Sequence, residues 1–179
     1  MRKLLFALIV LLGLGSPVLA SSTEQWIAGN GVGLTWTDVC GVEVKTTAIT
    51  AGNAVQCSVV VTNATALDIF ADFSVNIASV TTAANAPYIG LYLYPLNEDG
   101  TTYGDGQFGS AASGSTLAGQ YFACAIPAVA SATAAVVGNC RGVILPPGSF
   151  KMVFYNNLGV ATTSSGNSVQ YRTYNRQAH

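Results

Sequence analysis

Charged side chains are scarce in this sequence. Seven Lys and Arg, eight Asp and Glu and one His occur among 179 residues, so 8% of the chain is charged, where about a quarter is usual. Nucleic-acid binding draws on clustered Lys and Arg that contact phosphates. Because the formal net charge is −1 and no basic cluster occurs, we expect no nucleic-acid partner.

Catalytic groups are equally sparse. The single His is the terminal residue, His179, so neither a Ser-His-Asp nor a Cys-His arrangement has an internal base. No G-x-S-x-G motif occurs, and this excludes the usual nucleophile turn of α/β-hydrolases. A glycosidase-like carboxylate pair stays open from Glu43, Asp68, Asp72 or Glu98, but no pattern brings two of them together. We therefore expect neither enzyme activity nor a cofactor.

A long apolar run occurs only at the N-terminus. Arg2 and Lys3 precede LLFALIVLLGLG, and SPVLA leads to Ser21, which is the order of a secretory signal peptide. The run is about a dozen residues, short of the roughly 20 that cross a bilayer. The sequence predicts a leader over residues 1–20 and one exported domain, periplasmic or extracellular, over 21–179. A wrongly assigned start codon is the alternative.

Four cysteines remain, and no CxxC spacing or internal His accompanies them. Disulfides are therefore favoured over a zinc site in an oxidising compartment. Three pairings are possible. We favour Cys40 with Cys57 and Cys124 with Cys140, because each pair brackets a potential hairpin and closes a short loop. Four free, buried thiols are the alternative.

Alternation of apolar and polar residues indicates an all-β protein. Ile69, Ala71, Phe73, Val75 and Ile77 share one face of the clearest strand, opposite Asp72, Ser74 and Asn76, and Asp72 is expected to be solvated or at an edge. Two further alternating sets are Val55, Cys57, Val59 and Val61, opposite Gln56, Ser58 and Thr62, and Phe150, Met152 and Phe154. Other strands are expected at 34–39, 42–47, 88–94, 120–126, 141–145 and 169–174. Some nine short strands predict a single antiparallel β-sandwich.

The stretch YIGLYLYPL raises the question of a binding surface. If Leu91 and Leu93 point into the core, then Tyr88, Tyr92 and Tyr94 lie together on the other face, with Gly90 between them. Tyrosine suits a wet interface with protein or sugar. The alternative is that these rings pack beneath a loop.

Residues Asn97 to Gly109 read NEDGTTYGDGQFG and combine acids with glycines. Aligning Gly100 with the sixth position of an EF-hand puts Pro95 first and Gly106 twelfth, where acids are required. That alignment fails. Glu98, Asp99 and Asp105 remain weak candidates for an irregular calcium site, but Asp and Gly are also what an ordinary turn needs.

Several stretches of the sequence resemble small structural proteins of tailed bacteriophages and prophages. They are TEQWIAGNGVGLTWTDV, AGNAVQCSVVVTNATALDIFADFSV, YLYPLNEDGTTYGDGQFGS, RGVILPPGSFKMVFYNNLGVA and VQYRTYNRQ. The resemblance implies a jelly-roll-like sandwich that assembles on the virion surface as a capsid decoration, cement or fibre subunit. It supplies no active-site residues. Phage proteins assemble in the reducing cytoplasm, so the leader and the cysteines point instead to an exported protein, unless the leader is an artefact.

Two functional hypotheses follow. The first is a non-enzymatic structural protein that oligomerises or docks on a protein lattice through polar faces and the Tyr88 to Tyr94 strand. The second is an exported carbohydrate-binding or adhesin-like module. In that module Tyr92, Tyr94 and Tyr103 stack on sugar rings, and the Glu98 to Asp105 loop binds sugar hydroxyls or a calcium ion.

Overall fold

The computed structural model describes residues 24–27, 36–38, 40, 48–99, 117 and 119–178. The predicted leader and the predicted strand at 42–47 lie outside these ranges. The elements in chain order are β1 (Glu24–Ile27), β2 (Thr37–Asp38), β3 (Ala54–Thr62), β4 (Phe70–Thr81), β5 (Tyr88–Pro95), the 3-10 turn η1 (Gly119–Tyr121), β6 (Phe122–Pro127), β7 (Thr133–Ile144), β8 (Ser149–Asn157) and β9 (Ser168–Ala178). The prediction of an all-β chain is confirmed.

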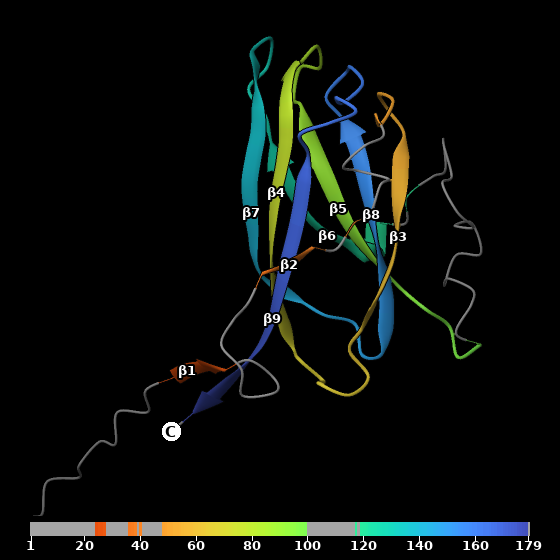
Figure 1. The fold of residues 1–179 in the computed structure, drawn as a ribbon, viewed down its shortest axis with the longest axis vertical. Coiled ribbons are helices and arrows are strands. Elements are labelled where there is room, and N and C mark those ends of the chain that lie inside the picture. The colour runs from red at the N-terminus through yellow and green to blue at the C-terminus, as the bar shows by residue number, and fades with distance from the viewer. Residues whose placement is uncertain are drawn as a thin grey trace, which may run out of the picture.

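Two antiparallel sheets pack face to face (Figure 1). In the first sheet, β9 and β7 flank β4, and β9 also pairs with β2 and, through its last residues, with β1. The second sheet has the order β3-β8-β5-β6. The chain crosses between the sheets at every connection from β3 onward except the one from β5 to β6, and this strand order is that of a jelly roll.

The core lies between the sheets and follows the predicted period of two. Ala71, Phe73, Val75 and Ile77 of β4 have no exposed surface, and they face apolar residues of β5 and β8. The β5 and β8 residues of this core are Ile89, Leu91, Leu93, Phe150, Met152 and Phe154. Burying a large aliphatic or aromatic side chain contributes about 1.5–3 kcal/mol, so these positions hold the two layers together.

The alternation fails at two predicted core positions. Ile69 is 52% exposed because it precedes β4, at the end of the sheet. Val59 is 39% exposed, while Gln56 is buried. The pairing of β3 with β8 shifts register between Gln56 and Val60, so Val59 lies in an irregular stretch, whereas Cys57 and Val61 on either side of it stay in the core.

Two strand boundaries also differ from the prediction. β7 begins at Thr133, eight residues before the strand expected at Arg141. The strand expected from Gln120 instead follows the turn η1 and begins at Phe122. Strand formation over Thr133 to Val137 is consistent with the β-branched residues there, which favour strands over helices.

The predicted disulfides, Cys40–Cys57 and Cys124–Cys140, are both present, with Cα–Cα distances of 4.9 and 6.2 Å. Cys40 follows β2 and Cys57 lies in β3, so one bridge joins the sheets at one flank. The other bridge joins β6 to β7, the edge strands at the opposite flank. Both flanks of the sandwich are therefore closed covalently.

Buried side-chain amides hold the connecting turns. Asn63 bonds to the backbone of Asp68 and Pro146, and Asn156 bonds to the backbone of Ile49, Leu158 and Val160. A buried amide is costly unless its donors and acceptors are used. These asparagines therefore fix turns that no regular strand pairing would fix.

Candidate functional site

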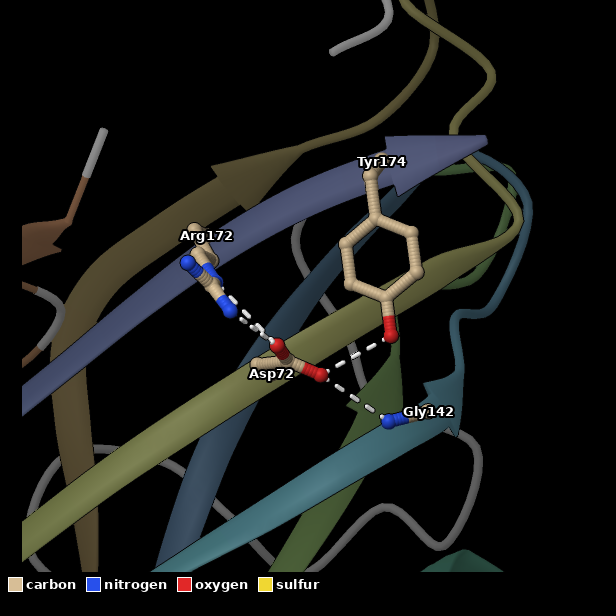
Figure 2. Close-up of polar contacts among 4 residues, drawn as sticks. All are labelled: Asp72, Gly142, Arg172 and Tyr174. Carbon is tan, nitrogen blue, oxygen red and sulfur yellow. Dashed lines mark hydrogen bonds and ion pairs between the residues drawn. The ribbon is translucent and has the colours of Figure 1, made fainter. Parts of the chain in front are cut away.

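The carboxylate of Asp72, on the outer face of the central strand β4, accepts four hydrogen bonds (Figure 2). Arg172 of β9 donates to Oδ2 from Nε at 3.1 Å and from Nη2 at 2.8 Å. Oδ1 accepts a hydrogen bond from the Tyr174 hydroxyl at 2.8 Å and another from the Gly142 backbone N–H at 3.0 Å. Four donors from two neighbouring strands thus converge on one carboxylate.

A β-bulge in β7 makes the fourth of these bonds possible. Ala71 pairs with Val143 and Phe73 pairs with Cys140, so Arg141 and Gly142 together lie opposite Asp72. Gly142 has a φ of +65°, a conformation that glycine adopts without steric cost. The bulge frees the Gly142 N–H from the strand ladder, and Asp72 takes the place of a backbone acceptor.

The environment keeps Asp72 ionised. Burial by itself raises the pKa of this carboxyl, but the bonds from Arg172, Gly142 and Tyr174 and the Arg172 charge together lower the pKa below its ordinary value of 3.8. Burial, the largest cause, together with the hydrogen bond to Asp72 and the Asp72 charge, raises the pKa of Tyr174, although Gly142 and the Arg172 charge act in the opposite direction. Each Asp72 oxygen already accepts two hydrogen bonds, so the carboxylate is poorly suited to accept a proton from a substrate. Its role is structural, and we call Asp72 with Arg172, Tyr174 and Gly142 the clasp.

Trp36 extends this cluster across β9. The Arg172 guanidinium carbon lies 4.7 Å from the centroid of the Trp36 ring. A cation over an indole face contributes about 0.5–1 kcal/mol where it is exposed. Trp36 immediately precedes β2, so the contact ties the short β2 strand to the same clasp. The outer face of this sheet therefore carries a continuous row from Trp36 through Arg172 and Asp72 to Gly142.

An apolar row lies beside the clasp on this outer face. Tyr174, Phe70 and Ile144 occupy paired positions on β9, β4 and β7, and the Phe70 and Tyr174 rings stack with centroids 5.9 Å apart. Ile144 is 72% exposed, and Val137 farther along β7 is 64% exposed. We call the exposed surface of β9, β4 and β7 the β7–β4–β9 face.

The predicted tyrosine platform lies on the outer face of the other sheet, as expected, but it is covered. Tyr92 is 9% exposed and Tyr94 has no exposed surface. The Tyr121 ring of η1 lies 4.7 Å from the Tyr94 ring, and Tyr92 meets the edge of Phe122. The two tyrosines belong to a second apolar cluster with Ala54 and Val153, so the alternative of packed rings holds for them. Burial raises the pKa of Tyr92, and neighbouring tyrosines raise it further.

Tyr88 is half-buried and packs against Tyr155 at a centroid distance of 6.2 Å. Gly90 makes room for these rings, since a Cβ there would lie 3.1 Å from Tyr92 and 3.4 Å from Tyr88. Tyr88 is thus the one member of the predicted platform within the described residues that keeps substantial exposed surface. Tyr103 lies outside them.

The predicted acidic loop is described only at its start. Glu98 and Asp99 are exposed in the turn that follows β5, and Asp105 lies outside the described ranges. Within those ranges, no three His, Cys, Asp or Glu side chains are grouped so that they could hold a metal ion. The calcium hypothesis for this loop stays a prediction.

A groove opens at the flank closed by the second disulfide. It has a volume of about 580 Å³ and lies between the start of β6 and the end of β7, with Leu93 and Pro95 of β5 also lining it. Its other lining residues include Phe122, Cys124, Cys140 and Arg141. The groove therefore exposes part of a disulfide next to apolar side chains and a cation.

Sequence reasoning placed Asp72 correctly on the polar face but wrongly expected it to be solvated or at an edge. It is buried because β4 is central and because Arg172 and Tyr174 cover it. These partners follow Asp72 by 100 and 102 residues, and no local pattern links them. The one available signal was Gly142 inside a strand pattern, which suggests a bulge.

Comparisons with known proteins identify no relative. The chain matches no protein-family model, no curated protein and no solved structure. In the described part of the chain, no helix has the length and apolar character needed to cross a membrane.

Proposed function

We propose that this chain is a non-enzymatic structural protein, a subunit that associates with protein partners, including further copies of itself, in a larger assembly. The observation that carries the proposal is the β7–β4–β9 face, on which Ile144 and Val137 are largely exposed. A contiguous exposed apolar surface rimmed by polar residues marks protein interaction sites, and Ile144 continues the apolar row of Tyr174 and Phe70 on this face. Asp72 and Arg172 on this face already neutralise each other's charge in an ion pair, so a docking partner would not have to break that pair.

The fold agrees with this role. Jelly rolls build viral capsid subunits and also lectins, so the architecture suits the virion-type function that the sequence resemblance implies. Fold alone does not assign function, and the exposed apolar residues of β7 are what favour assembly. We infer further that the protein works in an oxidising, exported setting, because two disulfides are compatible with one and the N-terminus reads as a signal peptide.

The carbohydrate-binding hypothesis depended on an open tyrosine platform. Tyr94 is fully buried and Tyr92 nearly so, whereas sugar stacking needs an accessible aromatic face. We therefore put forward assembly with protein, and leave sugar binding as an outcome of the test.

Light scattering in solution tests the proposal. The wild-type chain should form an oligomer, and Ile144→Asp or Val137→Asp should shift it toward monomer while circular dichroism stays unchanged. Val129→Asp is the matched control, because Val129 is equally exposed but lies in the turn between β6 and β7. A wild-type chain that stays monomeric and binds a glycan array would overturn the proposal.

A further inference from the structure

The two disulfides lie in different surroundings although they close loops of nearly equal length, with sequence separations of 17 and 16. Cys40 and Cys57 are 2% and 0% exposed and belong to the main core. Cys124 is half-buried and, with Cys140, lines the groove between β6 and β7. The second bridge therefore borders a surface groove, whereas the first is enclosed in the core.

Access to the sulfur is one of the factors that set the rate of thiol–disulfide exchange. The attacking thiolate must contact one sulfur of the bridge. The groove has room for a small thiol or for the side chain of a protein thiol, since its volume is about 580 Å³. Cys140 is more buried than Cys124, so the sulfur open to attack is that of Cys124.

We propose that Cys124–Cys140 is a modification site at which the folded protein exchanges its disulfide with an external dithiol. One thiolate of the dithiol attacks Cys124 Sγ and forms a mixed disulfide, and the electron pair of the broken S–S bond leaves on Cys140 Sγ. The second thiol of the dithiol loses its proton and attacks its partner sulfur, which releases Cys124 as a thiolate. Two electrons pass to the protein, the dithiol becomes a disulfide, and the two cysteine sulfurs take up the two protons.

Arg141 assists the departure of Cys140. It follows Cys140 in the chain and is the only charged residue among the described residues that line the groove. A nearby cation lowers the pKa of a cysteine thiol, and a thiol of lower pKa leaves faster. On this proposal Arg141 speeds the exchange through its charge.

Reduction here would remove the covalent connection between the two sheets at one flank only. β6 and β7 are edge strands of opposite sheets, and the bridge crosses between them near the groove. The Cys40–Cys57 bridge would keep the other flank closed. The exchange therefore changes one side of the sandwich and leaves the main core in place.

Timed reduction of the full-length oxidised protein tests the proposal. The chain is exposed to dithiothreitol at neutral pH, quenched at intervals and alkylated, and the labelled cysteines are mapped by mass spectrometry while circular dichroism reports the fold. Enclosed bridges react through opened states, and the unfolded fraction of a typical protein is about 10⁻³ or less. We expect Cys124 and Cys140 to be labelled at least about 100-fold faster than Cys40 and Cys57, before any change in dichroism.

Three results would overturn the proposal: similar labelling rates for the two bridges, earlier labelling of Cys40 and Cys57, or labelling of Cys124 and Cys140 only as the dichroism is lost. The wild-type chain suffices for this test, so no cysteine variant has to fold. Arg141→Gln should slow the first step by about threefold or more, and Arg141→Lys should restore most of the rate. An unchanged rate in Arg141→Gln would remove Arg141 from the mechanism.

Discussion

Asp72 and Arg172, which are 100 residues apart in sequence, form a closed ion pair in which two guanidinium nitrogens donate to a single carboxylate oxygen. The pair joins β4 to β9 on the outside of the sheet, whereas most stabilisation of a sandwich comes from the inside. A charge-assisted bond of this kind is about twice as strong as a neutral one. The remaining carboxylate oxygen extends the connection to β7 through Gly142.

Removing the Asp72 charge should destabilise the fold. Asp72→Asn leaves Arg172 without its counter-ion beneath Trp36 and weakens the bonds from Tyr174 and Gly142. We expect a loss of about 2–4 kcal/mol in the free energy of unfolding, measured by urea denaturation. Asn76→Asp, on the exposed part of the same strand face, is the control and should change stability by less than about 0.5 kcal/mol. An equal effect of both changes would contradict the clasp.

The clasp should also be lost in acid. The pKa of Asp72 in the folded protein lies below its ordinary value of 3.8, so the unfolded chain takes up the proton first as the pH falls. The stability that Asp72 contributes is therefore complete above pH 3.8 and disappears as the pH drops through the folded-state pKa. The stability difference between wild type and Asp72→Asn should shrink over that acid range. A constant difference down to strongly acidic pH would show that Asp72 is not held ionised.

Phe73 tests which face of β4 is inside. Its side chain has no exposed surface and its ring lies 6.3 Å from that of Tyr171. Phe73→Asp would place an unpaired charge in the core, and we expect the domain to unfold. Loss of the strand signal in circular dichroism is the measurement. A soluble Phe73→Asp protein as stable as wild type would mean that the core lies elsewhere.

Alanine substitutions at two glycines with positive φ distinguish the cost of backbone strain alone from the cost of an added steric clash. Gly52 has a φ of +74° and open space around its Cα, whereas a Cβ on Gly159, at φ +78°, would lie 2.6 Å from the backbone nitrogen of Ala84. Gly52→Ala should therefore cost about 1–2 kcal/mol, and Gly159→Ala clearly more, because backbone must move. Thermal unfolding of the two variants compares them, and equal melting temperatures would refute the clash.

The sequence was most informative where a contact depends on alternation alone. The period of two correctly placed alternate residues from Ala71 to Ile77 in the core and the tyrosines of β5 on the outer face of their sheet. The spacing of the cysteines correctly indicated both disulfides. Prediction from the sequence failed where the exposure of a side chain depends on strand register or on a covering segment that is distant in the chain. The bulge in β3 turned Val59 outward, and Tyr121 covers Tyr94 although 27 positions separate them in the chain. Neither relationship leaves a local trace in residue spacing.

The two bridges at opposite flanks have a consequence for how copies of this chain can associate. Strand exchange between protomers requires an edge element to leave its own fold and enter that of a neighbour. β3 and β7 are edge strands, and each is fastened to the opposing sheet through Cys57 or Cys140. While both bonds are intact, neither of these two strands can be exchanged, so an assembly of the oxidised chain cannot be built by swapping β3 or β7 between protomers.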